Sequence, residues 1–286
     1  MKHGLQILLL FCCSLSIQAQ RKDVSNAKLI GIGGVNILDT YLSPENYRGT
    51  EIRFIDHTTR NRIDTARLGE QLGSDSRGNS FRSHPLYKPW STELIHQGYL
   101  SRTHNRADNN NELAGMYTFS YGKHYNWHLL DGRLELKAGG MVEGNIGFLY
   151  NTRNSNNPAQ ARIALNLSPS GVASYQKWLG RHCYYIRYEV SVPLVGVMFS
   201  PNYGQSYYEI FNEGNYDHNI IPTTIISTPS LRQMLTLDFN LWHSTFRVGY
   251  LGDYQQAEVN HLKYHSYSHL IVLGFVKQFS IIKQRP

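Results

Sequence analysis

The chain has 286 residues, three cysteines and a net charge of +7. No apolar run after residue 20 is long enough for a transmembrane helix, which excludes a helical membrane protein. No basic run or nucleic-acid motif accompanies the positive charge, so it favours acidic partners such as outer-membrane lipids and lipopolysaccharide over nucleic acid.

The first nineteen residues have the pattern of a secretory signal peptide. Lys2 gives a basic start, an apolar run covers 7–17, and the small residue Ala19 precedes Gln20. The apolar run is too short to cross about 30 Å of hydrocarbon as a helix. We therefore predict an exported protein that is cleaved after Ala19.

The cysteines do not provide a disulfide framework. Cleavage removes Cys12 and Cys13 and leaves Cys183 without an intramolecular partner. Lipidation of Cys12 or Cys13 is the weaker alternative, because the bulky Leu10 and Phe11 precede them where a lipidation site has small residues. An exported chain of this size without disulfides takes its order from a large core or a closed sheet.

The first predicted strands form two hairpins on either side of a weak segment. Residues 29–57 read as a hairpin whose loop, 43–49, contains Pro, Asn and Gly. Segment 58–92 is charged and rich in Ser, Gly and Arg, so we predict a poorly ordered loop there, with one further strand pair as the alternative. A second hairpin follows over 93–127, and aromatic residues alternate along its second arm: Tyr117, Phe119, Tyr121, Tyr125 and Trp127.

The segment 133–150, RLELKAGGMVEGNIGFLY, has the clearest strand pattern in the chain. Its even positions are apolar or glycine, while its odd positions carry four charges. The segment is far longer than a soluble strand of about five or six residues. Because a strand that crosses a bilayer at a tilt needs roughly 9–11 residues, this pattern predicts a transmembrane β-strand.

Further alternating segments continue the pattern. Strands are predicted at 159–168 and 183–199, and Pro193 in the second is expected to mark a bulge. Between them, 169–182 is expected to contain a short amphipathic helical turn at the membrane interface. The last three strands are predicted at 231–241, 245–253 and 267–279.

These segments predict an all-β fold, an antiparallel transmembrane β-barrel of ten strands, or of twelve if 58–92 hides a pair. Residues 20–286 then form a single barrel domain. An even number of strands places both termini on the periplasmic side, with short turns there and longer loops outside. The loops expected outside are 42–50, 107–111, 151–158, 200–229 and 254–266. Segments 57–92 and 169–182 depart from this rule, because they are long and fall on the periplasmic side.

Charged residues share the strand parity that faces the lumen: Arg133, Glu135, Lys137, Glu143, Arg162, Arg187, Glu189, Arg232, Asp238, Arg247 and Asp253. Six are basic and five acidic. An unpaired buried charge costs several kcal/mol, so we expect them to pair. In so narrow a barrel the pairs would plug the lumen as a structural charge network. A narrow polar conduit for a small solute is the alternative.

No motif identifies an enzyme, a cofactor site or a metal site. His261, His265 and His269 repeat every four residues, but on an extended chain this spacing separates neighbours by about 13 Å. Neither His-x-Ser nor Gly-x-Ser-x-Gly occurs, although a His/Ser pair from separate strands stays open. A membrane-embedded lipid-modifying hydrolase is therefore the alternative function, and we predict no catalytic residue, metal or cofactor.

The segment 202–211, NYGQSYYEIF, is the candidate recognition surface on the outer side. Aromatic rings beside Asn and Gln suit contacts with glycans or lipid headgroups. The candidate residues are Tyr203, Tyr207, Tyr208 and Glu209. The alternative is that they cap the mouth of the barrel as part of its fold.

Several short sequence motifs resemble those of a known family: YLSPENYRG, SNNPAQA, MFSPNYGQSYYEIF, YLGDYQ and VNHLKYHSYSH. Over approximately residues 30–280 the chain resembles an uncharacterised family of exported barrel proteins from Gram-negative bacteria, known as a domain of unknown function. The resemblance implies a location in the cell outer membrane and no established activity, so it supplies no catalytic residues. An aromatic residue near the end of the last strand, Phe279, is typical of a signal read by the outer-membrane assembly machinery, which is the other expected partner.

Overall fold

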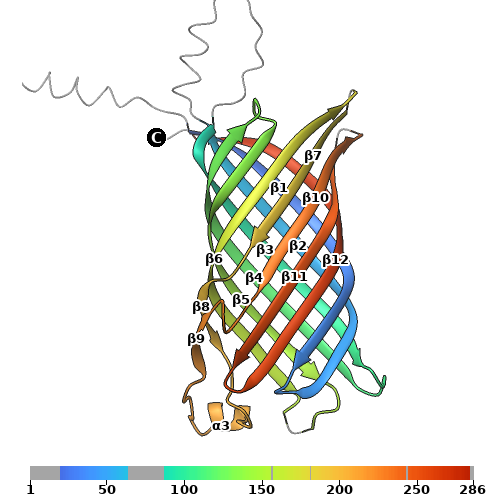
Figure 1. Cartoon of the computed structure of the whole chain (residues 1–286), viewed down its shortest axis with the longest axis vertical. Coiled ribbons are helices and arrows are strands. Elements are labelled where there is room, and N and C mark those ends of the chain that lie inside the picture. The colour runs from blue at the N-terminus through green and yellow to red at the C-terminus, as the bar shows by residue number, and fades with distance from the viewer. Residues whose placement is uncertain (1–19, 64–86, 156, 181, 243, 284–286) are drawn as a thin grey trace, which may run out of the picture.

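The computed structural model describes residues 20–63, 87–155, 157–180, 182–242 and 244–283, so the predicted signal peptide lies outside the described residues. In the described part of the chain, no helix has the length and apolar character needed to cross a membrane. Figure 1 shows its strands and one short helix. They are β1 (Gln20–Asp39), β2 (Ser43–Ile63), β3 (Tyr87–Asn105), β4 (Asn111–Leu129), β5 (Leu134–Asn151), β6 (Ala159–Leu179), β7 (His182–Ser191), β8 (Val195–Phe199), α3 (Tyr207–Phe211), β9 (Ile220–Thr224), β10 (Leu231–Leu241), β11 (Ser244–Val259) and β12 (Leu262–Lys283).

Ten of these strands close into an antiparallel barrel. Strands β1 to β7 pair in chain order, β7 pairs with β10, and β10, β11 and β12 follow in order. The ladder between β12 and β1 completes the ring. The predicted antiparallel barrel is thus confirmed, with ten strands in its wall. Strands β8 and β9 extend the wall at one end, because β8 pairs with the first part of β6 and β9 pairs with β8.

The range 58–92, predicted as a poorly ordered loop, is strand at both ends. Strand β2 includes its start and β3 includes its end, while the middle of the range lies outside the described residues. In β2, Thr59 and Ile63 are buried whereas Arg60 and Arg62 are exposed. Arg60 and Arg62 therefore belong to the outward face of β2, where their charge obscured the alternation in the sequence.

The helical turn expected within 169–182 is wrong. Strand β6 continues through most of this range and pairs on both edges. Gly171, for example, lies opposite Ala138 of β5 and Val190 of β7. Because backbone groups on both edges of β6 are paired, the sheet overrides the local amphipathic pattern.

The predicted strand 183–199 is divided by Pro193, which lies between β7 and β8. The bulge expected at this proline is therefore confirmed as an irregularity that ends one regular ladder before the next begins. Uninterrupted alternation would put Met198 on the outer face, but Met198 is buried and Val195 is exposed. The parity after Pro193 is shifted by one residue, since proline has no N–H for a ladder bond.

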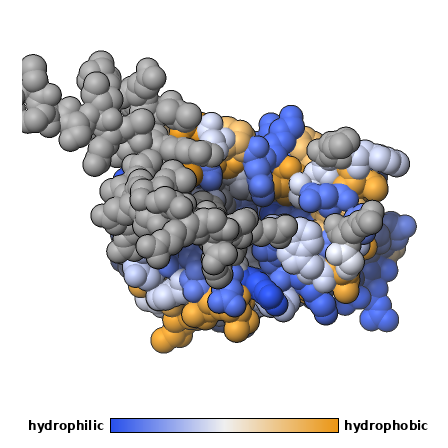
Figure 2. Space-filling model, turned by 90° about the horizontal axis from the view of Figure 1, so that it is seen from above, coloured by the Kyte–Doolittle hydropathy of each residue, from blue (hydrophilic) through white to orange (hydrophobic). Residues whose placement is uncertain are grey.

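The wall has an apolar outer surface, and its interior contains many buried polar and charged side chains. Large hydrophobic side chains stand exposed on the outside of many strands, for example Phe54 (61% exposed), Leu100 (67%) and Ile271 (70%). Seen from above, hydrophobic residues gather on the outer rim (Figure 2). An apolar band of this kind is typical of a barrel wall that faces lipid.

The first and last strands begin and end together at one end of the barrel, as the pairing of Gln20 with Lys283 requires. The opposite end, which the prediction places outside the cell, is called the outer end below. Two loops predicted to be long there are tight turns instead. Strand β2 begins at Ser43, and β11 and β12 are joined through Asn260 and His261, both with positive φ (51° and 60°). Such a two-residue turn matches the twist of the paired strands, which therefore extend further than expected.

Candidate functional site in the barrel lumen

The strands bring charged side chains from distant parts of the sequence together in the lumen. Of the predicted set, the buried residues are Lys137, Glu143, Arg187, Asp238, Arg247 and Asp253. Those that are partly buried are Glu135, Arg162, Glu189 and Arg232. Arg133 does not belong to the lumen, because it lies in the turn before β5 and is exposed. Gly132, with a φ of 81°, makes that turn.

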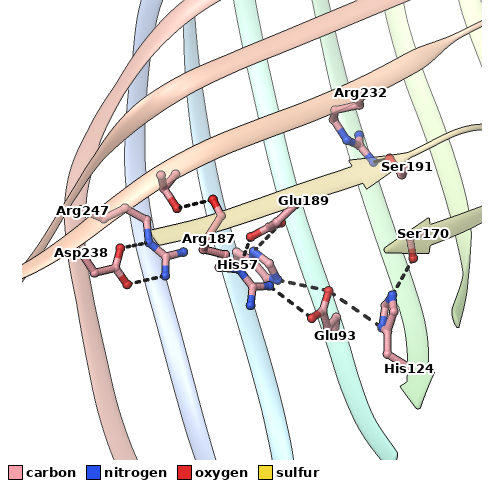
Figure 3. Close-up of polar contacts among 11 residues, drawn as sticks. His57, Glu93, His124, Ser170, Arg187, Glu189, Ser191, Arg232, Asp238 and Arg247 are labelled. Carbon is pink, nitrogen blue, oxygen red and sulfur yellow. Dashed lines mark hydrogen bonds and ion pairs between the residues drawn. The ribbon is translucent and has the colours of Figure 1, made fainter. Parts of the chain in front are cut away.

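Glu93 of β3 is the centre of one polar cluster in the lumen (Figure 3). His57 of β2 lies 3.5 Å from one oxygen of its carboxylate, and Arg187 of β7 lies 3.3 Å from the other. Arg187 also donates a hydrogen bond to Glu189, and Nδ1 of His57 lies 3.6 Å from Glu189. The cluster therefore ties β2 and β3 to β7, which is not adjacent to them in the wall.

His124 and Ser170 form a hydrogen-bonded pair at the edge of this cluster. Their side chains reach each other across β5, with 2.5 Å between Nε2 of His124 and Oγ of Ser170. Gly139 lies between them in the ladder and has no side chain to separate them. Nδ1 of His124 is 3.9 Å from a Glu93 oxygen, beyond hydrogen-bond distance. The arrangement has the order serine, histidine, carboxylate, but its second link is an electrostatic contact only.

A second cluster surrounds Arg53 of β2. Its Nε donates to Glu51 at 2.7 Å, and its Nη1 donates to Asp253 of β11. The guanidinium also lies over the ring of Tyr99, 4.7 Å from the centroid. Ser268 of β12 donates to the second Glu51 oxygen at 2.5 Å. This cluster links β2 with β11 and β12.

Three further ion pairs use six more of the predicted residues. Arg232 of β10 lies 2.5 Å from Glu143 of β5. Arg247 donates two hydrogen bonds, at 2.6 and 2.7 Å, to Asp238 on the neighbouring strand. Lys137 lies 3.5 Å from Glu135.

Apolar side chains fill much of the remaining lumen. Near the outer end one cluster contains Val35, Ile37, Leu42, Tyr99, Ala114, Met116, Leu149, Met198, Ala257 and Tyr264. Two cavities lined by lumen residues have volumes of about 90 Å³ and about 40 Å³. At roughly 10–15 Å³ per water, the smaller one holds only about three or four water molecules. Both of these cavities are therefore small.

Four lumen residues that carry the clusters were absent from the predicted set: Glu51, Arg53, His57 and Glu93. The first three share one parity along a segment that was predicted as a strand. This alternation could have identified them as lumen residues if the two faces of the segment had been assigned. Glu93 lay at the start of another predicted strand, beside the segment with weak periodicity. Among the described residues, no group of three or more His, Cys, Asp or Glu side chains is placed to hold a metal ion.

The four outer-loop candidates divide into two kinds. The hydroxyl of Tyr207 accepts a hydrogen bond from the Ala161 N–H at 2.6 Å, and Glu209 completes a capping box with Ser206 at the start of α3. Tyr203 and Tyr208 are exposed, at 74% and 63%. Burial raises the pKa of Tyr207 above its ordinary value. Tyr207 and Glu209 thus support the loop, and Tyr203 and Tyr208 face outward.

Comparisons with known proteins give a family and a fold resemblance. A family model described as "Protein of unknown function (DUF3316)" matches residues 5–68 and 77–286. No curated protein matches the chain. Among solved structures, the transport unit of the autotransporter AIDA-I from Escherichia coli is similar at 7% identity and a TM-score of 0.39, over 92% of this chain and 91% of that one. The translocator domain of NalP from Neisseria meningitidis is similar at 8% identity and a TM-score of 0.37, over 96% and 94%. Ail of Yersinia pestis, solved with a heparin analogue, has 11% identity and a TM-score of 0.26, over 90% and 99%.

Proposed function

We propose that this chain, which belongs to the DUF3316 family of proteins of unknown function, is an outer-membrane barrel with a closed lumen and a binding or structural role at its outer end. The first nineteen residues would direct its export. The apolar outer surface of the wall supports insertion into a bilayer, because the same hydrophobic residues would be unfavourably exposed in water.

The observation that carries this proposal is the set of ion pairs that cross the lumen. Arg53 joins Asp253, Arg187 joins Glu93, and Arg232 joins Glu143, each pair linking strands that are not neighbours in the wall. Removing one partner of a buried pair costs about 3–5 kcal/mol, since the other charge is left without a partner. A lumen held by such contacts favours a plug over a conduit for solutes.

Conductance across a planar bilayer tests the closure. We expect the purified, folded barrel to produce no unitary current steps, while a porin reconstituted in the same bilayer conducts. Heat-modifiable migration on SDS gels verifies that the barrel is folded in the sample. Regular current steps from the folded protein would contradict a closed lumen and favour permeation of a small solute.

Labelling of single cysteines in intact cells tests location and orientation. A membrane-impermeant maleimide should label Tyr208→Cys, because this side chain is 63% exposed at the outer end. The matched variant Asp131→Cys, in the exposed turn at the opposite end, should be labelled only after the outer membrane is permeabilised. The reverse pattern would place the termini outside the cell.

The alternative function, a lipid-modifying hydrolase, is favoured by one observation, the bond between His124 and Ser170. A serine nucleophile also needs room for its substrate, and the cavity beside Ser170 has only about 40 Å³. We therefore expect a fluorophosphonate probe to leave Ser170 unmodified in the folded barrel. A probe adduct on Ser170 that is lost in His124→Ala would support the hydrolase instead.

A further inference from the structure

The barrel wall is irregular where β9 meets the outer end of β11. The ladder between β7 and β10 stops at the pair Ser191–Arg232. Beyond that point β9 pairs with β8 but with no other described strand, while the outer end of β11 pairs only with β12. Segment 225–230 crosses the interval, with Ser227 O accepting from Glu258 N at 2.9 Å. A short loop thus replaces a ladder at this place in the wall.

The larger lumen cavity, of about 90 Å³, lies behind this loop. The residues that line it come both from the irregular part of the wall and from the lumen. Thr223, Thr228 and Ser230 contribute from β9 and the loop, and Gln255 and Gln256 contribute from β11. Asn145, Arg162, Asn166 and Arg232 contribute from the lumen side. At roughly 10–15 Å³ per water, the cavity has room for about six to nine waters, or for a compact polar group.

Arg162 is the cationic group in this cavity that has unused donors. Its guanidinium lies over the Tyr264 ring, 3.4 Å from the centroid, and 4.0 Å from an Asp39 oxygen. Among the described residues it donates no hydrogen bond, in contrast to Arg232, which donates to Glu143 at 2.5 Å. A guanidinium has five N–H donors in a planar fork that matches a phosphate or carboxylate.

The other charges of the cavity are already paired. Glu143 lies against Arg232, and Asp253 lies against Arg53. The side-chain amide of Asn166 also lines the cavity. Among the described residues one Glu143 oxygen is buried without a hydrogen-bond partner, and the Thr, Ser and Gln side chains of the lining can both donate and accept. The guanidinium of Arg162 is therefore the group that favours an anionic ligand, and the remaining polar groups suit a ligand with hydroxyl groups beside its phosphate.

The outside of the irregular wall is aliphatic. Ile226 in the loop is 89% exposed, Ile225 is 43% exposed, and Leu194 and Val195 on the adjoining strand segment are 42% and 49% exposed. Leu194 O accepts from Ile225 N, so these side chains belong to one surface. A polar cavity behind an aliphatic rim suits a headgroup inside and hydrocarbon outside.

We propose that this lateral cavity binds a phosphate-bearing headgroup, with Arg162 as its principal ligand-binding residue and segment 225–230 as its entrance. The phosphate belongs either to a membrane amphiphile or to a free phosphorylated sugar, which share this chemistry. The inference goes beyond the closed lumen, because a barrel that is plugged along its axis still admits a ligand through its side.

Binding to the folded full-length barrel in a phosphate-free detergent, measured by native mass spectrometry, tests the proposal. The probes are dihexanoyl phosphatidylglycerol and glucose 6-phosphate, with glucose as the uncharged control. We expect wild-type protein to bind at least one phosphate probe, and Arg162→Ala to weaken this binding about tenfold to a hundredfold. The matched control is Arg102→Ala, an exposed arginine of β3, which should bind like wild type.

The outcomes separate the two sources and the two proposals. Binding of only the lipid assigns a membrane amphiphile, and binding of only the sugar phosphate assigns a soluble ligand. Wild-type protein that binds neither probe, or Arg162→Ala that binds as tightly as wild type, overturns the proposal. The same samples are tested for conductance, so a conducting barrel with binding that depends on Arg162 refutes closure and leaves the cavity site intact.

A reversible cross-link tests the entrance separately. Ser227 and Glu258 are joined through their backbones, so Ser227→Cys with Glu258→Cys should form a disulfide without a change of fold. Oxidation should lower the association rate of the phosphate probe that binds wild-type protein at least tenfold, and a reductant should restore this rate. An unchanged rate in the oxidised protein would overturn segment 225–230 as the entrance.

Discussion

Replacing Gly139 with alanine should destabilise the barrel, because β4 leaves no room for a side chain there. A Cβ built on Gly139 would lie 2.0 Å from the Lys123 carbonyl oxygen and 2.8 Å from the His124 Cα. Both are backbone atoms, so neither can rotate away as a side chain would. The strands must move apart by about 1 Å for this contact to reach even 3.0 Å.

The size of the effect follows from what this displacement disrupts. Overpacking of a well-packed site costs about 1–3 kcal/mol. Stretching the ladder beside Gly139 weakens hydrogen bonds that contribute about 0.5–1.5 kcal/mol each. The change also moves His124 relative to Ser170. We therefore expect Gly139→Ala to lower the free energy of unfolding by about 2–4 kcal/mol.

The matched control lies on the same strand. A Cβ added at Gly144 meets no atom within 4 Å, so Gly144→Ala should change the free energy of unfolding by no more than about 0.5 kcal/mol. Urea unfolding in phospholipid vesicles, followed by tryptophan fluorescence, measures both variants. Equal stabilities of the two variants would refute the steric reasoning.

Three further predictions concern individual contacts. Arg247→Met should cost about 3–5 kcal/mol, because Asp238 is left buried without its ion pair, and adding Asp238→Leu should recover most of the loss; simple additivity in the double-mutant cycle would contradict this. Tyr207→Phe should make loop 200–219 more sensitive to proteolysis because the bond to Ala161 N is lost, whereas Tyr208→Phe should behave like wild type. The hydroxyl of Tyr41 donates a hydrogen bond to the Gln205 carbonyl oxygen, and burial raises the pKa of Tyr41. The stabilisation of the loop by protonated Tyr41 is therefore fully present below the ordinary tyrosine pKa of about 10 and falls as the pH rises above it. In Tyr41→Phe the resistance of the loop to proteolysis should fall less as the pH rises. A pH profile equal to that of wild type would refute the role of Tyr41 in this pH dependence.

Sequence alternation predicted the barrel well because it reports which face of a strand meets lipid. The segment 133–150 shows this clearly, since Val142 and Ile146 are exposed on the outside and Lys137 and Glu143 are buried inside. The same alternation could not predict which charges would meet. The partner of Glu143 is Arg232, 89 residues away, and only the closure of the ring brings these two strands within reach. Pairing inside the lumen is a property of the assembled barrel rather than of any strand.

The alternation of inward and outward side chains is broken at Pro193, next to the proposed ligand cavity. The shifted alternation and the irregular wall beside the cavity have the same cause. A regular strand from β7 into β8 would let the ladder with β10 continue beyond the pair Ser191–Arg232 and would leave a continuous wall. Proline interrupts the ladder, shifts the parity so that Met198 turns inward, and leaves β9 with β8 as its described ladder partner. Segment 225–230 then covers the interval that a strand would have filled. Both Pro193 and Met198 line the cavity behind it, so the residue that shifted the parity of the strand also borders the cavity that we propose as a ligand site.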